Sequence, residues 1–200
     1  MVRKIFCPVM LVLLMFVFLA APVSAGVPTD KIRQTTDKIL SYVTDPALKD
    51  PARAEERVNL IRKAVDERFD WDELSRRALG THWAARSPEE KKEFIHLFGK
   101  LLEKTYQDKV EGYSGEKAIY LGETVDGEYS VVDIKIATTK NTEIPVKYRL
   151  RQKGDDWLVY DIVIEGVSLV NNYRTQFTNI LAKSPYAELV KRLKEKVGEK

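Results

Sequence analysis

The chain has 200 residues and a formal net charge of +3, so it lacks the strong basic excess that is typical of nucleic-acid-binding proteins. The residues that follow the leader described below are enough for one domain with a sizeable core. Cys7 is the only cysteine and lies within that leader. We therefore expect the mature chain to hold no disulfide, no thiolate metal site and no cysteine nucleophile.

The first 25 residues have the pattern of a secretory signal. Arg3 and Lys4 form a basic start, an apolar stretch covers 9–21, and Val23-Ser24-Ala25 supplies the small residues that a signal peptidase needs. The apolar stretch is shorter than the roughly 20 residues of a transmembrane helix, and an uncleaved anchor is the alternative. We expect cleavage before Gly26, export to the periplasm and a mature net charge of +1, from 31 basic and 30 acidic residues.

The mature chain, 26–200, is predicted to form a single domain whose first half is helical. Apolar residues at helical spacing favour one helix over 29–44 and a second from about 51 to 69. A short third helix is expected between Asp70, which is a suitable N-cap, and Gly80, which is a suitable stop.

The next helix has the clearest start signal in the chain. Ser87, Pro88 and Glu90 provide an N-cap hydroxyl, a proline in the first turn and a glutamate at the third position, which together form a capping box. One face of this helix is unusually aromatic. Its members are Phe94, Leu97, Phe98, Leu101, Thr105 and Tyr106. The segment 112–115 contains two glycines and ends the helix, after which the hydrophobic period changes to two.

Four strand-like segments follow and are joined by short turns. They cover approximately 117–123, 128–138, 143–153 and 156–165. Because short links join antiparallel neighbours, we predict a meander. The middle two strands alternate between an apolar and a charged face. In the last strand, strict alternation assigns Leu158, Tyr160, Ile162 and Ile164 to one face, and Trp157, Val159 and Val163 to the other.

Two further helices are expected over 168–183 and 185–197. Together the elements predict an α+β fold, in which helices pack on one face of a curved antiparallel sheet of about four strands. Such an arrangement can close into a solid core or enclose an apolar cavity. Apolar periodicity predicts the same stripes for both outcomes, so the pattern by itself does not decide between them.

Residue types that are common in catalytic and metal sites form no recognised motif. His82 and His96 are the only histidines, and they fit no zinc-binding spacing. No serine lies in a G-x-S-x-G pattern, and the sequence has neither a P-loop nor a dinucleotide-binding glycine pattern. The acidic pair Asp70 and Asp72 has an ordinary use at a helix start. The sequence favours a protein that is not an enzyme and holds no metal, although carboxylates can still meet in space.

An ordered set of short strings sets this sequence apart. Phe69-Asp70-Trp71 and Ala78-Leu79-Gly80 precede Ser87-Pro88-Glu89 at the start of the aromatic helix. The strands contain Ile144-Pro145-Val146 with Tyr148-Arg149-Leu150. The most specific string is VYDIVIEGVSLVNNYRTQF over 159–177. In this order the strings resemble the MlaC family, the periplasmic phospholipid-binding proteins that are also called toluene-tolerance proteins.

The resemblance, which extends over roughly 30–195, implies a carrier and not an enzyme. It implies an apolar cavity between helices and sheet that takes the acyl tails of a phospholipid and leaves the head group exposed. It also implies two partners in the maintenance of outer-membrane lipid asymmetry: an inner-membrane MCE-domain protein of an ABC transporter and an outer-membrane lipoprotein complex. The phospholipid is cargo and no cofactor is expected. We expect a monomer that binds no nucleic acid.

On this interpretation, the residues that line the cavity and bind lipid come from the helices and from the inner face of the strands. The candidates are Trp83, Phe94, Leu97, Phe98, Leu101, Tyr106, Val146, Tyr148, Leu150, Val159, Ile162, Ile164 and Val167. For each of them, packing in a solid core is the alternative. The competing functional hypothesis is a small periplasmic enzyme or a peptide-binding module on a similar cone-shaped scaffold, and an enzyme would place titratable groups inside the cavity.

Overall fold

The computed structural model describes residues 26–199, and the predicted signal sequence lies outside the described residues. The helices are α1 (Val27–Thr44), α2 (Ala54–Asp66), α3 (Trp71–Leu79), α4 (Pro88–Glu111), α5 (Leu169–Leu181) and α6 (Tyr186–Val197). Two short 3-10 helices, η1 (Pro51–Arg53) and η2 (Gly80–His82), precede α2 and follow α3. None of the helices in this part of the chain is long and apolar enough to span a membrane.

The strands form one antiparallel sheet. They are β1 (Lys117–Asp126), β2 (Tyr129–Ala137), β3 (Glu143–Lys153), β4 (Asp156–Ile164) and β5 (Val167–Ser168), and they lie in chain order across the sheet. The predicted α+β class is confirmed, with five strands where about four were expected. The additional strand, β5, has two residues and returns against β4 after a turn in which Glu165 and Gly166 have positive φ. It is too short to show an alternating pattern.

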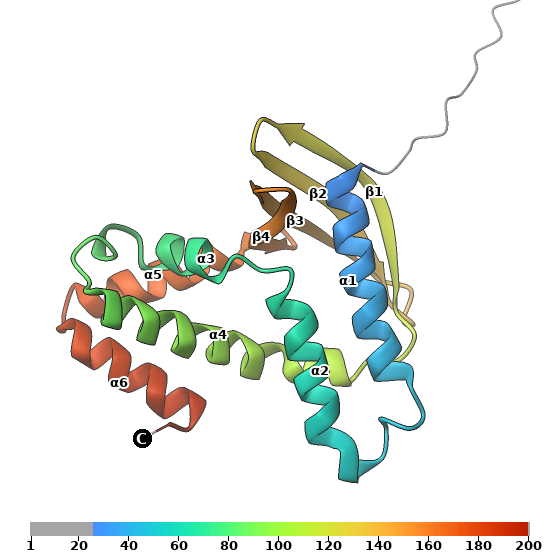
Figure 1. The fold of residues 1–200 in the computed structure, drawn as a ribbon, viewed down its shortest axis with the longest axis horizontal. Helices are drawn as coiled ribbons and strands as arrows, with labels where there is room; N and C mark the ends of the chain where they lie inside the picture. The colour runs from blue at the N-terminus through green and yellow to red at the C-terminus, as the bar shows by residue number, and fades with distance from the viewer. Residues whose placement is uncertain (1–25, 200) are drawn as a thin grey trace, which may run out of the picture.

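The helices fall into two groups (Figure 1). α1 and α2 lie over one face of the sheet, whereas α3, α4, α5 and α6 form a bundle beside it. Each group has its own core. The bundle core includes Leu74, Phe94, Leu97, Phe98, Leu101, Tyr173, Phe177, Leu189 and Leu193. The sheet core includes Ile32, Val132, Ile134, Val146, Leu150, Trp157 and Val159. Phe69, between α2 and α3, packs against both cores.

A short parallel bridge joins the start of the bundle to the sheet. The Asp70 N–H donates to the carbonyl oxygen of Val159 at 2.9 Å, and the Val159 N–H donates to the carbonyl of Arg68 at 2.8 Å. The Asp70 carboxylate caps α3 by accepting from the N–H of Glu73, which agrees with its predicted role as N-cap. It also accepts from Arg151 of β3 at 2.8 Å. Backbone and side-chain hydrogen bonds therefore both hold the start of α3 against the sheet.

Strand β4 contains one extra residue relative to β3. Arg149 pairs with Asp161, but the next residue of β3, Leu150, pairs with Val159, which leaves Tyr160 unmatched. Such a β-bulge changes the phase of the alternation. Val159 and Ile162 therefore both pack on the inner face of the sheet. The prediction that they lie on opposite faces is wrong, because it treated every residue of the strand as one regular step.

Candidate functional site: an open apolar cavity

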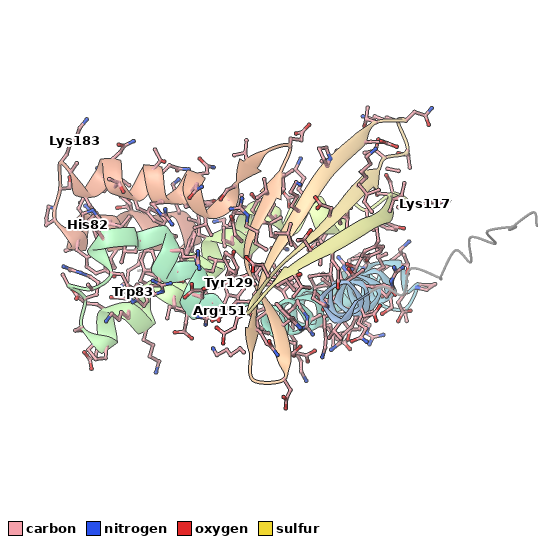
Figure 2. The ribbon with its side chains drawn as sticks, turned by 90° about the horizontal axis from the view of Figure 1, so that it is seen from above. His82, Trp83, Lys117, Tyr129, Arg151 and Lys183 are labelled. Carbon is pink, nitrogen blue, oxygen red and sulfur yellow. The ribbon has the colours of Figure 1, made fainter. Side chains whose placement is uncertain are left out.

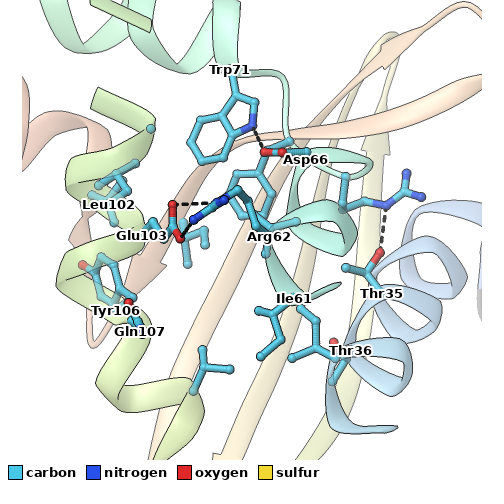
Figure 3. Close-up of a pocket in the computed structure, with 18 of the residues that line it drawn as sticks. Thr35, Thr36, Ile61, Arg62, Asp66, Trp71, Leu102, Glu103, Tyr106 and Gln107 are labelled. Carbon is cyan, nitrogen blue, oxygen red and sulfur yellow. Dashed lines mark hydrogen bonds and ion pairs between the residues drawn. The ribbon is translucent and has the colours of Figure 1, made fainter. Parts of the chain in front are cut away.

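An open cavity lies between the inner face of the sheet and helices α1, α2 and α4 (Figure 3). Its volume is about 610 Å³, which falls within the roughly 300–1,000 Å³ of sites that enclose small molecules. Most of its wall is apolar. The apolar residues include Ile32, Ile39, Val58, Ile61, Val65, Phe69, Trp71, Ile95, Leu102, Val110, Ile136, Val146, Ile162, Ile164 and Leu169. Such a wall favours an apolar ligand over water.

The cavity stays open because α2 lies over it without being embedded in a core. Ala64 is the one residue of this helix that is buried. The apolar stripe of α2, formed by Val58, Ile61 and Val65, faces the cavity instead of a second layer of side chains. An amphipathic helix normally buries this stripe against another element. In this protein the stripe forms part of the cavity wall, where an apolar ligand can contact it.

Helix α1 is fixed to the sheet at its first turn. Thr29 donates its backbone N–H at 2.8 Å and its hydroxyl at 2.6 Å to the carboxylate of Glu123 on β1. Ile32, one turn later, is buried in the sheet core. The remaining part of α1 contributes Thr35, Thr36 and Ile39 to the cavity wall. One end of α1 is thus anchored while its middle borders the open space.

Gly99 makes room on the α4 side of the cavity. It lies in the middle of α4 and lines the wall, and a Cβ atom added there would meet no other atom within 4 Å. Glycine inside a helix costs about 1 kcal/mol relative to alanine. The position therefore lowers helix stability and leaves free volume where α4 faces the sheet.

Polar groups gather on the rim, where α2 faces α4 (Figure 3). Arg62 donates from Nε and Nη2 to the two carboxylate oxygens of Glu103, and from Nη1 to Asn59 at 2.9 Å. The hydrogen bonds with Glu103 raise the pKa of Arg62 above its ordinary value. Beside this pair, Asp66 accepts a hydrogen bond from the indole of Trp71 at 2.8 Å. The cavity therefore combines an apolar interior with a charged edge, which suits a ligand that has the same division.

On the deeper wall, the hydroxyl of Tyr148 is neutral and the charge of Arg68 is paired. Burial raises the pKa of Tyr148 to about 12, so its hydroxyl stays neutral at physiological pH. Arg68 is buried and donates to Asp156 and to the carbonyl oxygen of Trp157, which satisfies its charge within the protein. Within 26–199, no group of three or more His, Cys, Asp and Glu side chains is arranged to hold a metal ion.

Five of the thirteen predicted lining residues border this cavity. They are Tyr106, Val146, Tyr148, Ile162 and Ile164. Tyr106 comes from α4 and the other four come from β3 and β4, so the structure brings residues from both predicted walls together. Their contact with lipid stays a prediction.

The other eight lie elsewhere, which corrects the predicted cavity wall. Phe94, Leu97, Phe98 and Leu101 are buried in the bundle core. Trp83 packs against that core at the end of the bundle away from the sheet (Figure 2). Leu150 and Val159 are fully buried in the sheet core, and Val167 is 61% exposed. The cause on α4 is that both faces of this helix are apolar, and the more aromatic face packs against the other bundle helices.

Sequence reasoning missed most of the helical wall. On α4, the cavity face includes Ile95, Gly99, Leu102, Tyr106 and Val110, of which Leu102 and Tyr106 also contact the bundle core. A glycine inside a long amphipathic helix was the available signal, since such a residue usually has a packing or functional reason. The sequence predicts α1 and α2 from their apolar spacing, but periodicity does not tell whether an apolar stripe meets side chains or open space.

A search against protein-family models matches residues 33–195 to the family described as MlaC protein. The chain belongs to the MlaC family. One relative is the Haemophilus influenzae protein named intermembrane phospholipid transport system binding protein MlaC. It is 22% identical over 202 residues, and the alignment covers 98% of this chain and 94% of that protein.

Two further comparisons agree with this assignment. Toluene tolerance protein ttg2D of Pseudomonas putida is 20% identical over 176 residues, which covers 87% of this chain and 82% of that protein. The solved structure of a phospholipid-binding protein from Ralstonia solanacearum, in complex with a phospholipid, superposes with a TM-score of 0.78 at 22% identity. It covers 86% of this chain and 98% of that one. At this identity the superposition establishes a shared fold.

Proposed function

We propose that this MlaC-family protein is a periplasmic carrier that holds a phospholipid by its acyl tails. The observation that carries the proposal is the open apolar cavity between the sheet and α1, α2 and α4. The names of its relatives, which refer to intermembrane phospholipid transport and phospholipid binding, support the same cargo. The charged rim at Arg62 and Glu103 would lie next to the head group, outside the apolar interior.

Simple energetics explain why such a carrier is needed. Each CH₂ group taken out of a membrane into water costs roughly 0.8 kcal/mol, so a free lipid with two long tails faces a barrier well above about 10 kcal/mol. A cavity about as apolar as the membrane interior makes the transfer nearly neutral. The direction of transport is then left to the partners. We propose that these are an inner-membrane MCE-domain protein of an ABC transporter and an outer-membrane lipoprotein complex.

The test is to purify the periplasmic protein without detergent and measure bound phospholipid by native mass spectrometry. We expect near one-to-one occupancy. Val146→Trp, which places a large ring in the cavity, should reduce the occupancy. The matched control is Val167→Trp, which changes an exposed position on the short last strand. Folded wild-type protein that contains no lipid, or equal occupancy in the two variants, would contradict the proposal.

A further inference from the structure

The cations on the cavity wall differ in how they are paired. Arg68 and Lys100 each meet a carboxylate that lies outside the wall. Arg62 instead meets Glu103, which lines the same cavity. Among the residues the structure describes, this is the one ion pair with both partners on the wall. A ligand that fills the cavity must therefore come close to both members of the pair.

The exposure of the pair places it at the boundary between cavity and solvent. The Arg62 side chain is 46% exposed and that of Glu103 is 25% exposed. Arg62 comes from α2 and Glu103 from α4, so the pair spans the rim from one helix to the other (Figure 3). A lipid with its tails in the cavity would carry its phosphate to this boundary, because the phosphate is the first charged group beyond the tails and their ester links.

Arg62 already uses the geometry that a phosphate requires. Its Nε and Nη2 atoms donate to the two oxygens of one carboxylate, and a guanidinium binds two phosphate oxygens in the same way. We propose that Arg62 binds the phosphate of the lipid cargo and that Glu103 takes this place when the cavity is empty. This proposal rests on the proposed function. The carboxylate is then a built-in competitor, and release of the lipid is assisted by the return of Glu103 to its partner.

A second ion pair between the same helices provides the control. Arg57 of α2 donates to Glu111 of α4 at 3.4 Å and to the carbonyl oxygen of Leu48 at 2.6 Å. Unlike Arg62, Arg57 does not line the cavity. If ion pairs matter only because they hold α2 to α4, loss of either arginine should have similar consequences. If Arg62 is a phosphate ligand, the two arginines should differ.

The experiment measures the affinity of delipidated protein for two ligands with identical tails. Dioctanoyl phosphatidylcholine carries a phosphate, and dioctanoylglycerol does not. For Arg62→Gln we expect roughly tenfold weaker binding of the phospholipid, as estimated for a lost charge-assisted bond, and unchanged binding of the diacylglycerol. Glu103→Gln should bind the phospholipid more tightly, because it removes the competitor. Arg57→Gln should leave the ratio of the two affinities unchanged.

The signs of the effects separate the alternatives. A purely structural ion pair predicts that Arg62→Gln and Glu103→Gln shift binding in the same direction, and for both ligands equally, which would overturn the proposal. Glycerophosphocholine, a head group without tails, should not displace the phospholipid. Displacement that is lost in Arg62→Gln would support the phosphate contact at Arg62, whereas displacement that persists in Arg62→Gln would place the head group elsewhere and overturn the proposal. If wild-type protein binds neither lipid, the proposed function itself fails, and that result differs from each of the others.

Discussion

The bundle and the sheet half of this protein are built from similar apolar stripes. The bundle packs these stripes closely, whereas the sheet half has a core and also an open cavity. In the bundle, the centroid of the Phe98 ring lies 5.0 Å from the ring centroid of Tyr173 and 5.3 Å from that of Phe177. In the sheet half, the stripe of α2 faces open space and Ala64 is the residue of that helix that is buried. The difference lies in what covers each stripe. The bundle stripe of α4 is enclosed by α3, α5 and α6, whereas α2 has no second layer on its cavity side.

The packed region that stabilises this fold is thus separate from the open cavity. α4 belongs to both regions, because its aromatic face packs in the bundle and its opposite face lines the cavity. Changes on the two faces of this one helix should therefore have different consequences.

The largest effect on stability is expected from truncation in the bundle. Phe98 is fully buried, so Phe98→Ala should lower the free energy of unfolding by about 3–5 kcal/mol. Ile162→Ala, on the cavity wall, should cost much less, because its side chain already borders an empty space. Chemical denaturation of the delipidated proteins measures both. Equal losses would mean that the cavity wall is packed as tightly as the bundle.

The junction between the two regions should respond to acid. Burial by itself would raise the pKa of Glu73, but the hydrogen bonds from Arg76 and Arg77 outweigh it and lower the pKa to about 2. Because the folded pKa lies below the ordinary value of 4.5, the stabilisation is present above pH 4.5 and is lost as the pH falls toward 2. The loss should reach up to about 3 kcal/mol.

The measurement is the free energy of unfolding between pH 6 and pH 2, compared between wild type and Glu73→Gln. The variant lacks the titrating carboxylate, so its stability should start lower and fall less steeply over this range. Parallel curves for the two proteins would show that Glu73 does not contribute to the acid sensitivity.

A smaller effect is expected from one substitution made at two neighbouring positions of α4. Leu101→Trp overfills the bundle core and should cost roughly 1–3 kcal/mol. Gly99→Trp places the same ring in the cavity, where nothing lies within 4 Å of its Cβ, so stability should be unchanged or slightly higher. Bound phospholipid should show the reverse order, with Gly99→Trp losing lipid and folded Leu101→Trp retaining it. If Leu101→Trp loses lipid at full stability, the bundle face also contacts the cargo.

Much of the fold could be predicted from local patterns. The capping box at Ser87 and Glu90 and the N-cap at Asp70 form as expected, because each involves residues within one turn of the other. The alternation in β2 and β3 likewise identified the inner face of the sheet. These features depend on spacing along the chain, which a sequence contains directly.

The cavity wall could be predicted only in part, because it depends on which elements meet. The aromatic face of α4, with Phe94 and Phe98, was the more conspicuous of two apolar faces, and the bundle covers it. The opposite face, with Ile95 and Leu102, could be assigned to the cavity only after the helices were placed. Strand β4 was misjudged for a similar reason, since an unmatched residue can be recognised only against its partner strand.

That unmatched residue, Tyr160, is the one position at which β4 is longer than the segment of β3 that it pairs with. Val159 and Asp161 pair with neighbouring residues of β3, so removing the residue between them would leave the other pairs in place. The guanidinium of Arg77, on α3, lies 4.2 Å above the Tyr160 ring, and the ring of Tyr129 lies 6.0 Å away. The extra residue therefore adds side-chain contacts with Arg77 and Tyr129 between two regularly paired halves of the strand. Deletion of Tyr160 should therefore remove these two contacts and leave the paired residues of the cavity wall in place.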